Sequence, residues 1–210
     1  LVDSTTLRHL GAAGIIHLGA GNVQVVFGTF SELIREEISK LMRKELKQVL
    51  FSSPVQGKMI PLTEVPDKIF SHKIVGDGVA FIPERGDVVS PVAGKITLIY
   101  PSKHAIGIET EEGLEVLIHI GIDTSQLPGK WFKTHVKVGE EVQQGQILIQ
   151  FRLTEVNEHS TSLATPMIIT NPDLVKSWNF APYKAVKKGQ ASVMSVVLKE
   201  RDTIGGNSND

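Results

Sequence analysis

The stretch KHAIGIETEEGLEVLIHIGIDT, residues 103–124, holds two of the chain's seven histidines and two runs of alternating aliphatic residues. Alternation at every second position is typical of β-strands, and a short polar segment with glycine, such as TEEG, is typical of a turn. The stretch therefore predicts a β-hairpin that carries His104 near one open end and His119 near the other.

The register of this hairpin decides whether the two histidines meet. If Glu111 and Glu112 occupy the tip of the turn, His104 lies directly opposite His119. Directly opposed side chains share one face of a sheet, with their Cβ atoms about 4.5–5.5 Å apart. A shift of the pairing by one residue would place the two rings on opposite faces, so the prediction depends on this register.

Two close imidazoles have a chemistry that one imidazole lacks. Neighbouring rings disfavour a second positive charge, which keeps at least one of them neutral near pH 7. A neutral ring nitrogen is a nucleophile, and the second ring can donate a hydrogen bond to a group that the first acquires. The alternative is a pair of structural histidines, which the residues alone leave equally open.

From Pro54 onward the chain consists of short β-rich segments separated by glycine and proline. The predicted strands are KMIPL, VAFIP, DVVSPVAGKITLIY, HAIGIE, LEVLIHI, HVKVG, QILIQF, MIIT and SVMSVVL. Short, closely spaced strands predict a mainly β fold, an antiparallel β-sandwich or barrel, rather than βαβ units. One short helix is expected at RLTEVNEHS, and the polar residues 202–210 are expected to form a disordered tail.

The segment ahead of Pro54 has a different pattern. Asp3 or Ser4 can cap a short helix, and Gly11 suits the end of that helix. GIIHL and VQVVFG then predict two strands around a glycine turn, and Ser31 begins a long helix with one apolar stripe. The segment is therefore expected to form a small α-β-β-α fragment.

Composition excludes several classes of function. The 210-residue chain has a net charge of −1, which gives no electrostatic reason to expect nucleic acid or an anionic membrane as a partner. It contains no cysteine, so a disulfide framework, a thiolate metal site and a cysteine nucleophile are all excluded. No apolar run approaches the roughly 20 residues that span a bilayer.

The segments around both histidines match a known family. GLEVLIHIGIDT around His119 and PSKHAIGI around His104 resemble the glucose-type enzyme IIA domain of the bacterial phosphoenolpyruvate-dependent sugar phosphotransferase system. The resemblance continues in the same order through SPVQGKMIPLTEVPDKIFSHKIVGDGVAFIP, VVSPVAGKI, VKVGEEVQQGQILIQF and TPMIITN. It implies an antiparallel β-sandwich or barrel of the enzyme IIA type, which we assign to residues 54–201.

The N-terminal segment resembles a second component of the same system. LRHLGAAGIIHLGAGNVQVVFGTFSELIREEISKLM is similar to the C-terminal half of the enzyme IIB domain. We therefore assign residues 1–42 to a IIB-like fragment and residues 43–53 to a linker. In that family the phosphorylated cysteine lies upstream of this segment, so the resemblance implies a fragment of a longer permease or a degenerate fusion.

The resemblance implies a phosphoryl carrier. The phosphocarrier protein HPr would phosphorylate His119, and the group would pass to an enzyme IIB cysteine and then to a sugar, with the membrane enzyme IIC domain as an indirect partner. His104 would bond the phosphoryl oxygens and Ser102 would complete the hydrogen-bond network, the alternative for Ser102 being a loop serine. Such a phosphotransferase would be cytoplasmic, and membrane-associated within a full-length permease.

Further residues are implied around the histidines. Gly121 would fix the tautomer of His119 by accepting a hydrogen bond from one ring nitrogen. Asp123 resembles a family carboxylate that meets the arginines of HPr, and Asp77 has the same interpretation. For both aspartates the alternative is a turn carboxylate that bonds its own backbone. The candidate apolar contacts with a partner are Val79, Tyr100, Ile106 and Leu117, with core packing as the alternative.

No cofactor is required for this chemistry, and no metal site follows from the spacing. Zinc could bind incidentally at His104 and His119 if a partner supplied a carboxylate. The alternatives are a biotinyl- or lipoyl-type carrier, a zinc endopeptidase and a non-catalytic IIA-like regulator that binds partners according to its phosphorylation state. Lys103 lacks the flanking residues of a carrier lysine, and no second histidine stands two places after His119. The regulator would use the same site.

Overall fold

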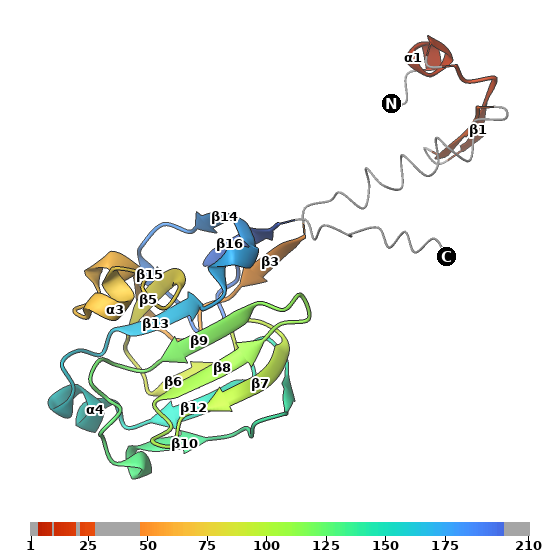
Figure 1. The fold of residues 1–210 in the computed structure, drawn as a ribbon. Coiled ribbons are helices and arrows are strands. Elements are labelled where there is room, and N and C mark those ends of the chain that lie inside the picture. Colours follow the sequence, from red (N-terminus) through yellow and green to blue (C-terminus); the bar gives the residue numbers. More distant parts are fainter. Residues whose placement is uncertain (1–3, 10, 20–21, 28–46, 200–210) are drawn as a thin grey trace, which may run out of the picture. The chain divides into compact units, whose positions relative to one another are not determined.

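The computed structural model describes residues 4–9, 11–19, 22–27 and 47–199 (Figure 1). The chain divides into two compact units, residues 1–46 and residues 47–210, and we describe each by itself. The long helix predicted from Ser31 and the disordered tail predicted for residues 202–210 lie outside the described residues.

The first unit contains the predicted helix and hairpin. Helix α1 (Ser4–His9) is followed by Gly11, whose φ of +93° is in the left-handed region that glycine adopts at helix ends. Strands β1 (Gly14–Gly19) and β2 (Asn22–Val26) then pair antiparallel. The first three elements of the predicted α-β-β-α fragment are therefore present, whereas its assignment to an enzyme IIB domain stays a prediction.

The second unit is built mainly of strands, and all of its pairings among the described residues are antiparallel. The strands are β3 (Gln48–Phe51), β4 (Gly57–Pro61), β5 (Asp77–Pro83), β6 (Asp87–Val89), β7 (Gly94–Ile99), β8 (Ala105–Glu109), β9 (Glu115–His119), β10 (Phe132–Thr134), β11 (Glu141–Val142), β12 (Ile147–Phe151), β13 (Thr165–Ile169), β14 (Val175–Phe180), β15 (Ala185–Val186) and β16 (Met194–Leu198). The predicted mainly β, antiparallel fold is confirmed.

These strands form three sheets. The largest has eight strands in the order β11-β7-β8-β9-β13-β5-β4-β15, and two smaller sheets have the orders β10-β12-β6 and β14-β16-β3. Helices are short: α3 (Lys68–Ser71), α4 (Leu153–His159) and the 3₁₀ helices η2 (Leu62–Glu64), η3 (Gly129–Trp131) and η4 (Pro172–Leu174). No helix within the described ranges combines the length and the apolar character needed to cross a membrane.

The eight-stranded sheet is buried on both faces in its central part. On β5, Val79 and Phe81 point into the larger core, whereas Ala80 points into a smaller cluster on the other face. That cluster contains Ile60, Leu62, Val65, Phe70, Ala80, Ile122, Ala164 and Ile168, with Leu117 packed against it. Because Phe70 belongs to α3 and Leu117 to β9, the helix covers the face of β9 on which His119 also lies.

One predicted domain boundary differs from the structure. Strand β3 lies inside the segment 43–53 that we assigned to a linker, and it pairs with β16 so that Phe51 is opposite Met194. Phe51 is fully buried. The second unit therefore begins before residue 54, because QVLF alternates exposed and buried residues ahead of the turn-rich SSPVQG.

The predicted strand at HVKVG is wrong. The strand β10 ends at Thr134, and the following residues turn toward Gly139, whose φ is +89°. Strand β14 was not predicted, because its sequence VKSWNF carries polar residues on the exposed face. The short helix predicted at RLTEVNEHS is confirmed as α4.

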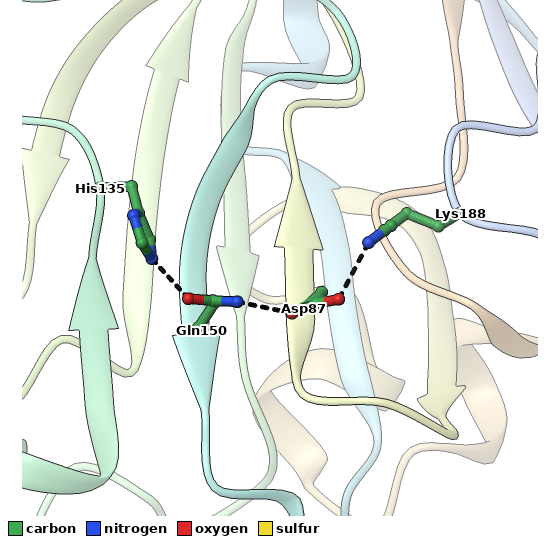
Figure 2. Close-up of polar contacts among 4 residues, drawn as sticks. All are labelled: Asp87, His135, Gln150 and Lys188. Atoms are coloured by element: carbon green, nitrogen blue, oxygen red, sulfur yellow. Dashed lines mark hydrogen bonds and ion pairs between the residues drawn. The ribbon is translucent and has the colours of Figure 1, made fainter.

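A chain of polar contacts crosses the exposed face of the sheet β10-β12-β6 (Figure 2). His135 Nε2 donates to Gln150 Oε1 at 2.8 Å, and Gln150 Nε2 donates to Asp87 Oδ1 at 3.0 Å. Lys188 Nζ donates to the second oxygen of Asp87 at 2.9 Å. Hydrogen bonds from Gln150 and Lys188 hold the pKa of Asp87 below its usual value. Through these two bonds the carboxylate links this sheet to the segment ahead of β16.

Candidate functional site

The hairpin of β8 and β9 forms in a register one residue away from the predicted one. Ala105, not His104, lies opposite His119, and Gly107 lies opposite Leu117. The turn explains the difference. Leu114 accepts from the amide of Thr110 at 2.9 Å and Gly113 has a φ of +87°, so the loop contains three residues rather than two.

The two imidazole rings nevertheless meet. Their centroids are 4.7 Å apart and their planes are inclined by 76°. His104 lies one residue ahead of β8, directly after Lys103, whose φ of +61° is in the left-handed region. Because His104 is outside the strand, strand alternation does not determine the direction of its side chain. The predicted contact is present, but the opposed-pair geometry that predicted it is wrong.

Helix α3 covers one side of the His119 ring. Asp67 caps this helix, with its Oδ1 accepting from the amides of Ile69 at 2.7 Å and Phe70 at 3.2 Å. The Phe70 ring lies 5.2 Å from the His119 ring, centroid to centroid. We did not predict Asp67 and Phe70 as parts of the site. The signal available was DKIF, an aspartate in the N-cap position of a short helix.

A backbone carbonyl selects the tautomer of His119. His119 Nδ1 lies 2.8 Å from the Gly121 oxygen, and a carbonyl oxygen can only accept. The proton of the neutral ring is therefore on Nδ1, and Nε2 carries a free lone pair. Burial lowers the pKa of His119, while the Gly121 carbonyl and the carboxylates of Asp67 and Asp123 act in the opposite direction.

His104 is held by Ser102 and is almost entirely buried. His104 is only 3% exposed, and its Nδ1 lies 2.7 Å from Ser102 Oγ. Burial first, and the neighbouring His119 second, lower the pKa of His104 to about 4. The ring is therefore neutral near pH 7. The ring of Tyr100, the residue that directly follows β7, lies 5.2 Å from the His104 ring, centroid to centroid.

The low pKa of His104 predicts a loss of stability in acid. Between pH 6.5 and about 4, His104 binds a proton in the unfolded chain but stays unprotonated in the folded chain. The free energy of unfolding therefore falls as the pH is lowered through this range, by up to about 3 kcal/mol from this group. Urea unfolding across the range measures it. A His104→Gln variant should lose less stability in acid than the wild type, and an equal loss would contradict the prediction.

The comparisons with known proteins identify the family. The family model for the phosphoenolpyruvate-dependent sugar phosphotransferase system, EIIA 1, matches residues 49–175. The chain belongs to this family. The solved structure of glucose permease IIA from Mycoplasma capricolum is similar with a TM-score of 0.67 and 36% sequence identity, over 70% of this chain and 96% of that chain. The protein is therefore a phosphoryl carrier of a sugar phosphotransferase system, a phosphotransferase component with a phosphohistidine intermediate.

The residues of this chain that we predicted as apolar contacts with a partner differ in their exposure to solvent. Val79 and Ile106 are fully buried in the larger core, so a docked protein cannot touch them and their interpretation as contacts is wrong. Leu117 is half-buried under the smaller cluster. Tyr100 is 40% exposed beside His104, which leaves it as the apolar candidate on the surface.

The two aspartates of the prediction have different surroundings in this IIA domain. Asp77 Oδ2 forms an ion pair with Lys73 at 2.8 Å, and its Oδ1 accepts from the amide of Gly78 at 2.7 Å. Both of its oxygens are occupied, which favours the alternative of a turn carboxylate. Asp123 is exposed, has a φ of +61° and accepts a hydrogen bond from the Thr161 hydroxyl.

The loop that holds His119 in this IIA domain requires glycine at position 121. Gly121 has a φ of +69°, and a Cβ there would lie 2.7 Å from Thr124 Cγ2 and 3.1 Å from the Ser162 oxygen. We expect Gly121→Ala to lower the free energy of unfolding by about 2–4 kcal/mol, because left-handed backbone strain and overpacking add. Urea unfolding measures this change.

Gly139→Ala is the matched control for this prediction. Gly139 has a φ of +89°, and a Cβ there would meet no atom within 4 Å. Its alanine variant carries the backbone strain alone, about 1–2 kcal/mol. Equal losses in the two variants would show that the packing around Gly121 is adaptable.

Proposed function

We propose that His119 accepts a phosphoryl group from phospho-HPr on Nε2 and passes it to the cysteine of an enzyme IIB domain. The observation that carries the proposal is the bond of 2.8 Å between His119 Nδ1 and the Gly121 carbonyl, which leaves Nε2 as a free nucleophile. The membrane enzyme IIC domain, which binds the sugar, is then an indirect partner. We also propose residues 1–42 as a IIB-like fragment, which rests on the resemblance of their sequence alone.

The transfer needs no general base. The lone pair of His119 Nε2 attacks phosphorus in line with the departing donor atom, which keeps the electron pair of the bond that breaks. The ring proton stays on Nδ1, where the Gly121 carbonyl stabilises the positive charge that develops on the imidazole. Transfer to a thiolate reverses this step and restores the neutral ring.

His104 is placed to stabilise the phosphoryl oxygens. When the Nδ1 atom of a neutral His104 accepts a hydrogen bond from the Ser102 hydroxyl, the ring proton is on Nε2, and this N–H can act as a donor. With a pKa of about 4 this ring stays neutral near pH 7. It therefore donates to the phosphoryl group without binding it as tightly as an imidazolium would, which suits a group that must leave again.

The surface around the site fits a protein donor. Several large apolar side chains are exposed on and after α3 and ahead of His104: Ile69, Ile74, Val75 and Tyr100. The carboxylates of Asp67 and Asp123 act on His119 electrostatically. Because carboxylates repel a free phosphate, their presence favours a donor whose own cationic groups accompany the phosphoryl group.

Incidental zinc binding needs a partner. No group of three or more histidine, cysteine or acidic side chains that could hold a metal occurs among the residues that the structure describes. His104 and His119 supply two nitrogen donors, and zinc sites in proteins are almost always four-coordinate. The predicted site at these histidines therefore stays a prediction that depends on a carboxylate from another protein.

The proposal is tested by incubating the chain with phosphoenolpyruvate, enzyme I and HPr. The expected product is an acid-labile, base-stable phosphate on His119, and ³¹P NMR should place it on Nε2. Omitting HPr should prevent labelling. An unlabelled chain under conditions in which HPr itself is phosphorylated would overturn the proposal, and a label on Nδ1 would overturn the assignment of the nucleophile.

A further inference from the structure

A threonine hydroxyl and a carboxylate meet beside the loop that follows His119. Thr161 Oγ1 donates to Asp123 Oδ2, and both residues are exposed. Thr161 lies two residues after the end of α4, far from Asp123 in the sequence. The sequence alone does not predict this contact, because neither the residue types nor their spacing indicates it.

The backbone in this region is fixed independently of the hydroxyl. The amide of Ile122 donates to the Ser162 carbonyl at 2.7 Å, and the amide of Thr161 donates to the Ile122 carbonyl at 3.1 Å. Ile122 itself is buried in the smaller cluster. Removing the Thr161 hydroxyl therefore releases the Asp123 carboxylate and leaves the loop in place.

A fixed orientation of the Asp123 carboxylate would favour the binding of a partner. It carries a negative charge at the edge of the site, where it acts on His119 together with Asp67. An exposed aspartate populates several side-chain rotamers, and a partner that binds one of them must select it at an entropic cost. A hydroxyl that occupies Oδ2 selects the rotamer in advance and leaves Oδ1 for a second donor.

We propose that Thr161 is a positioning residue, whose hydroxyl holds the Asp123 carboxylate in the orientation that receives a cationic group of the phosphoryl donor. This inference rests on the proposed function, since it assigns a donor-binding role at the same site. Thr161 acts through Asp123 and does not touch the phosphoryl group. Its effect therefore falls on donor binding and not on the chemical step.

The first test compares Thr161→Val with Thr161→Ser in steady-state phosphorylation by phospho-HPr. Thr161→Val should raise KM for phospho-HPr by about three- to tenfold and leave kcat nearly unchanged, because one hydrogen bond to a charged group is lost. Thr161→Ser keeps the hydroxyl and should restore KM. A rise in KM that serine does not reverse, or an effect on kcat alone, overturns the proposal.

Thr170→Val is the matched control. Thr170 Oγ1 donates to Glu115 Oε2 at 3.0 Å, another exposed pair of threonine and carboxylate. Glu115 is the first residue of β9 and His119 is the last, so this pair lies at the far end of the same strand. Its removal should leave KM unchanged. An equal rise in KM would show that the effect of Thr161 is not local.

A double-mutant cycle tests the route through the carboxylate. Asp123→Asn removes the charge and keeps a residue type that tolerates a positive φ. In that background Thr161→Val should raise KM no further, since the group that it positions has been removed. A rise as large as in the wild-type background overturns the proposal.

A last measurement separates this inference from the proposed function. Hα–Hβ couplings of Asp123, measured by NMR on the full chain, should report one rotamer in the wild type and in Thr161→Ser, and averaging in Thr161→Val. If the wild type accepts no phosphate, the proposed function fails while these couplings still decide whether Thr161 orients Asp123. Couplings that Thr161→Val leaves unchanged overturn the inference.

Discussion

Replacing His119 with glutamine should reduce phosphate uptake from phospho-HPr by at least about 1,000-fold, effectively to none. Glutamine has a similar length, and its amide N–H can still donate to the Gly121 carbonyl, so we expect the loop after β9 to keep its conformation. The amide nitrogen has no available lone pair and cannot attack phosphorus. Gel or mass-spectrometric detection of the phosphorylated chain, after incubation with phosphoenolpyruvate, enzyme I and HPr, measures the loss.

His159→Gln is the control for this prediction. His159 Nδ1 also lies against a backbone carbonyl, that of Glu155, at 2.9 Å. His159 is exposed at the end of α4, and its ring is tilted by 56° against the Trp131 ring at a centroid distance of 4.9 Å. This variant should accept phosphate like the wild type. Continued uptake in His119→Gln would place the acceptor elsewhere and refute the assignment.

The strands of the hairpin could be predicted from the sequence, but their register could not. Alternating aliphatic residues identify both strands, because one face must meet the core. The register depends on whether TEEG closes through two residues or three, and glycine permits both. In the structure Gly113 takes a positive φ, and the three-residue loop shifts the pairing by one. His104 still reaches His119 because it lies beyond the strand, after Lys103.

The buried faces explain why two predicted contacts are wrong. Val79 lies on β5, and the neighbouring strand β13 is buried at every position from Thr165 to Ile169. Where both faces of a strand are covered, hydrophobic periodicity cannot tell which side chains face a partner and which face the core. Ile106 belongs to the larger core for the same reason.

Other residues of the site were missed because nothing local marks them. Phe70 contacts the His119 ring, and the Asp67 carboxylate acts on it electrostatically, only because α3 packs onto the sheet. Thr161 donates to Asp123 only because the segment after α4 lies beside the loop that follows His119. Their partners are dozens of positions away in the sequence. Ser102 and Gly121 were predicted because the family resemblance implies them, and in the structure each contacts a histidine two residues along the chain.

His104→Gln should separate acceptance of the phosphoryl group from its delivery. We expect the variant to accept phosphate from phospho-HPr, because His119 keeps its contact with the Gly121 carbonyl and its free Nε2. Transfer to an enzyme IIB domain should fall by about 100-fold, since an amide held in a different geometry cannot replace the neutral imidazole N–H that donates to the phosphoryl oxygens. Rapid-quench measurement of phosphate moving from the phosphorylated chain to a IIB domain measures the loss.

The position of Ser102 makes a graded control available for this effect. Ser102→Ala removes the hydroxyl 2.7 Å from His104 Nδ1 but leaves the ring, so only the preference for one tautomer is lost. Delivery to IIB should then fall by a few-fold, between the wild type and His104→Gln. If His104→Gln accepts no phosphate, the ring is needed for the first transfer as well. If both variants deliver at the wild-type rate, His104 supports the packing around His119 and does not act on the phosphoryl group.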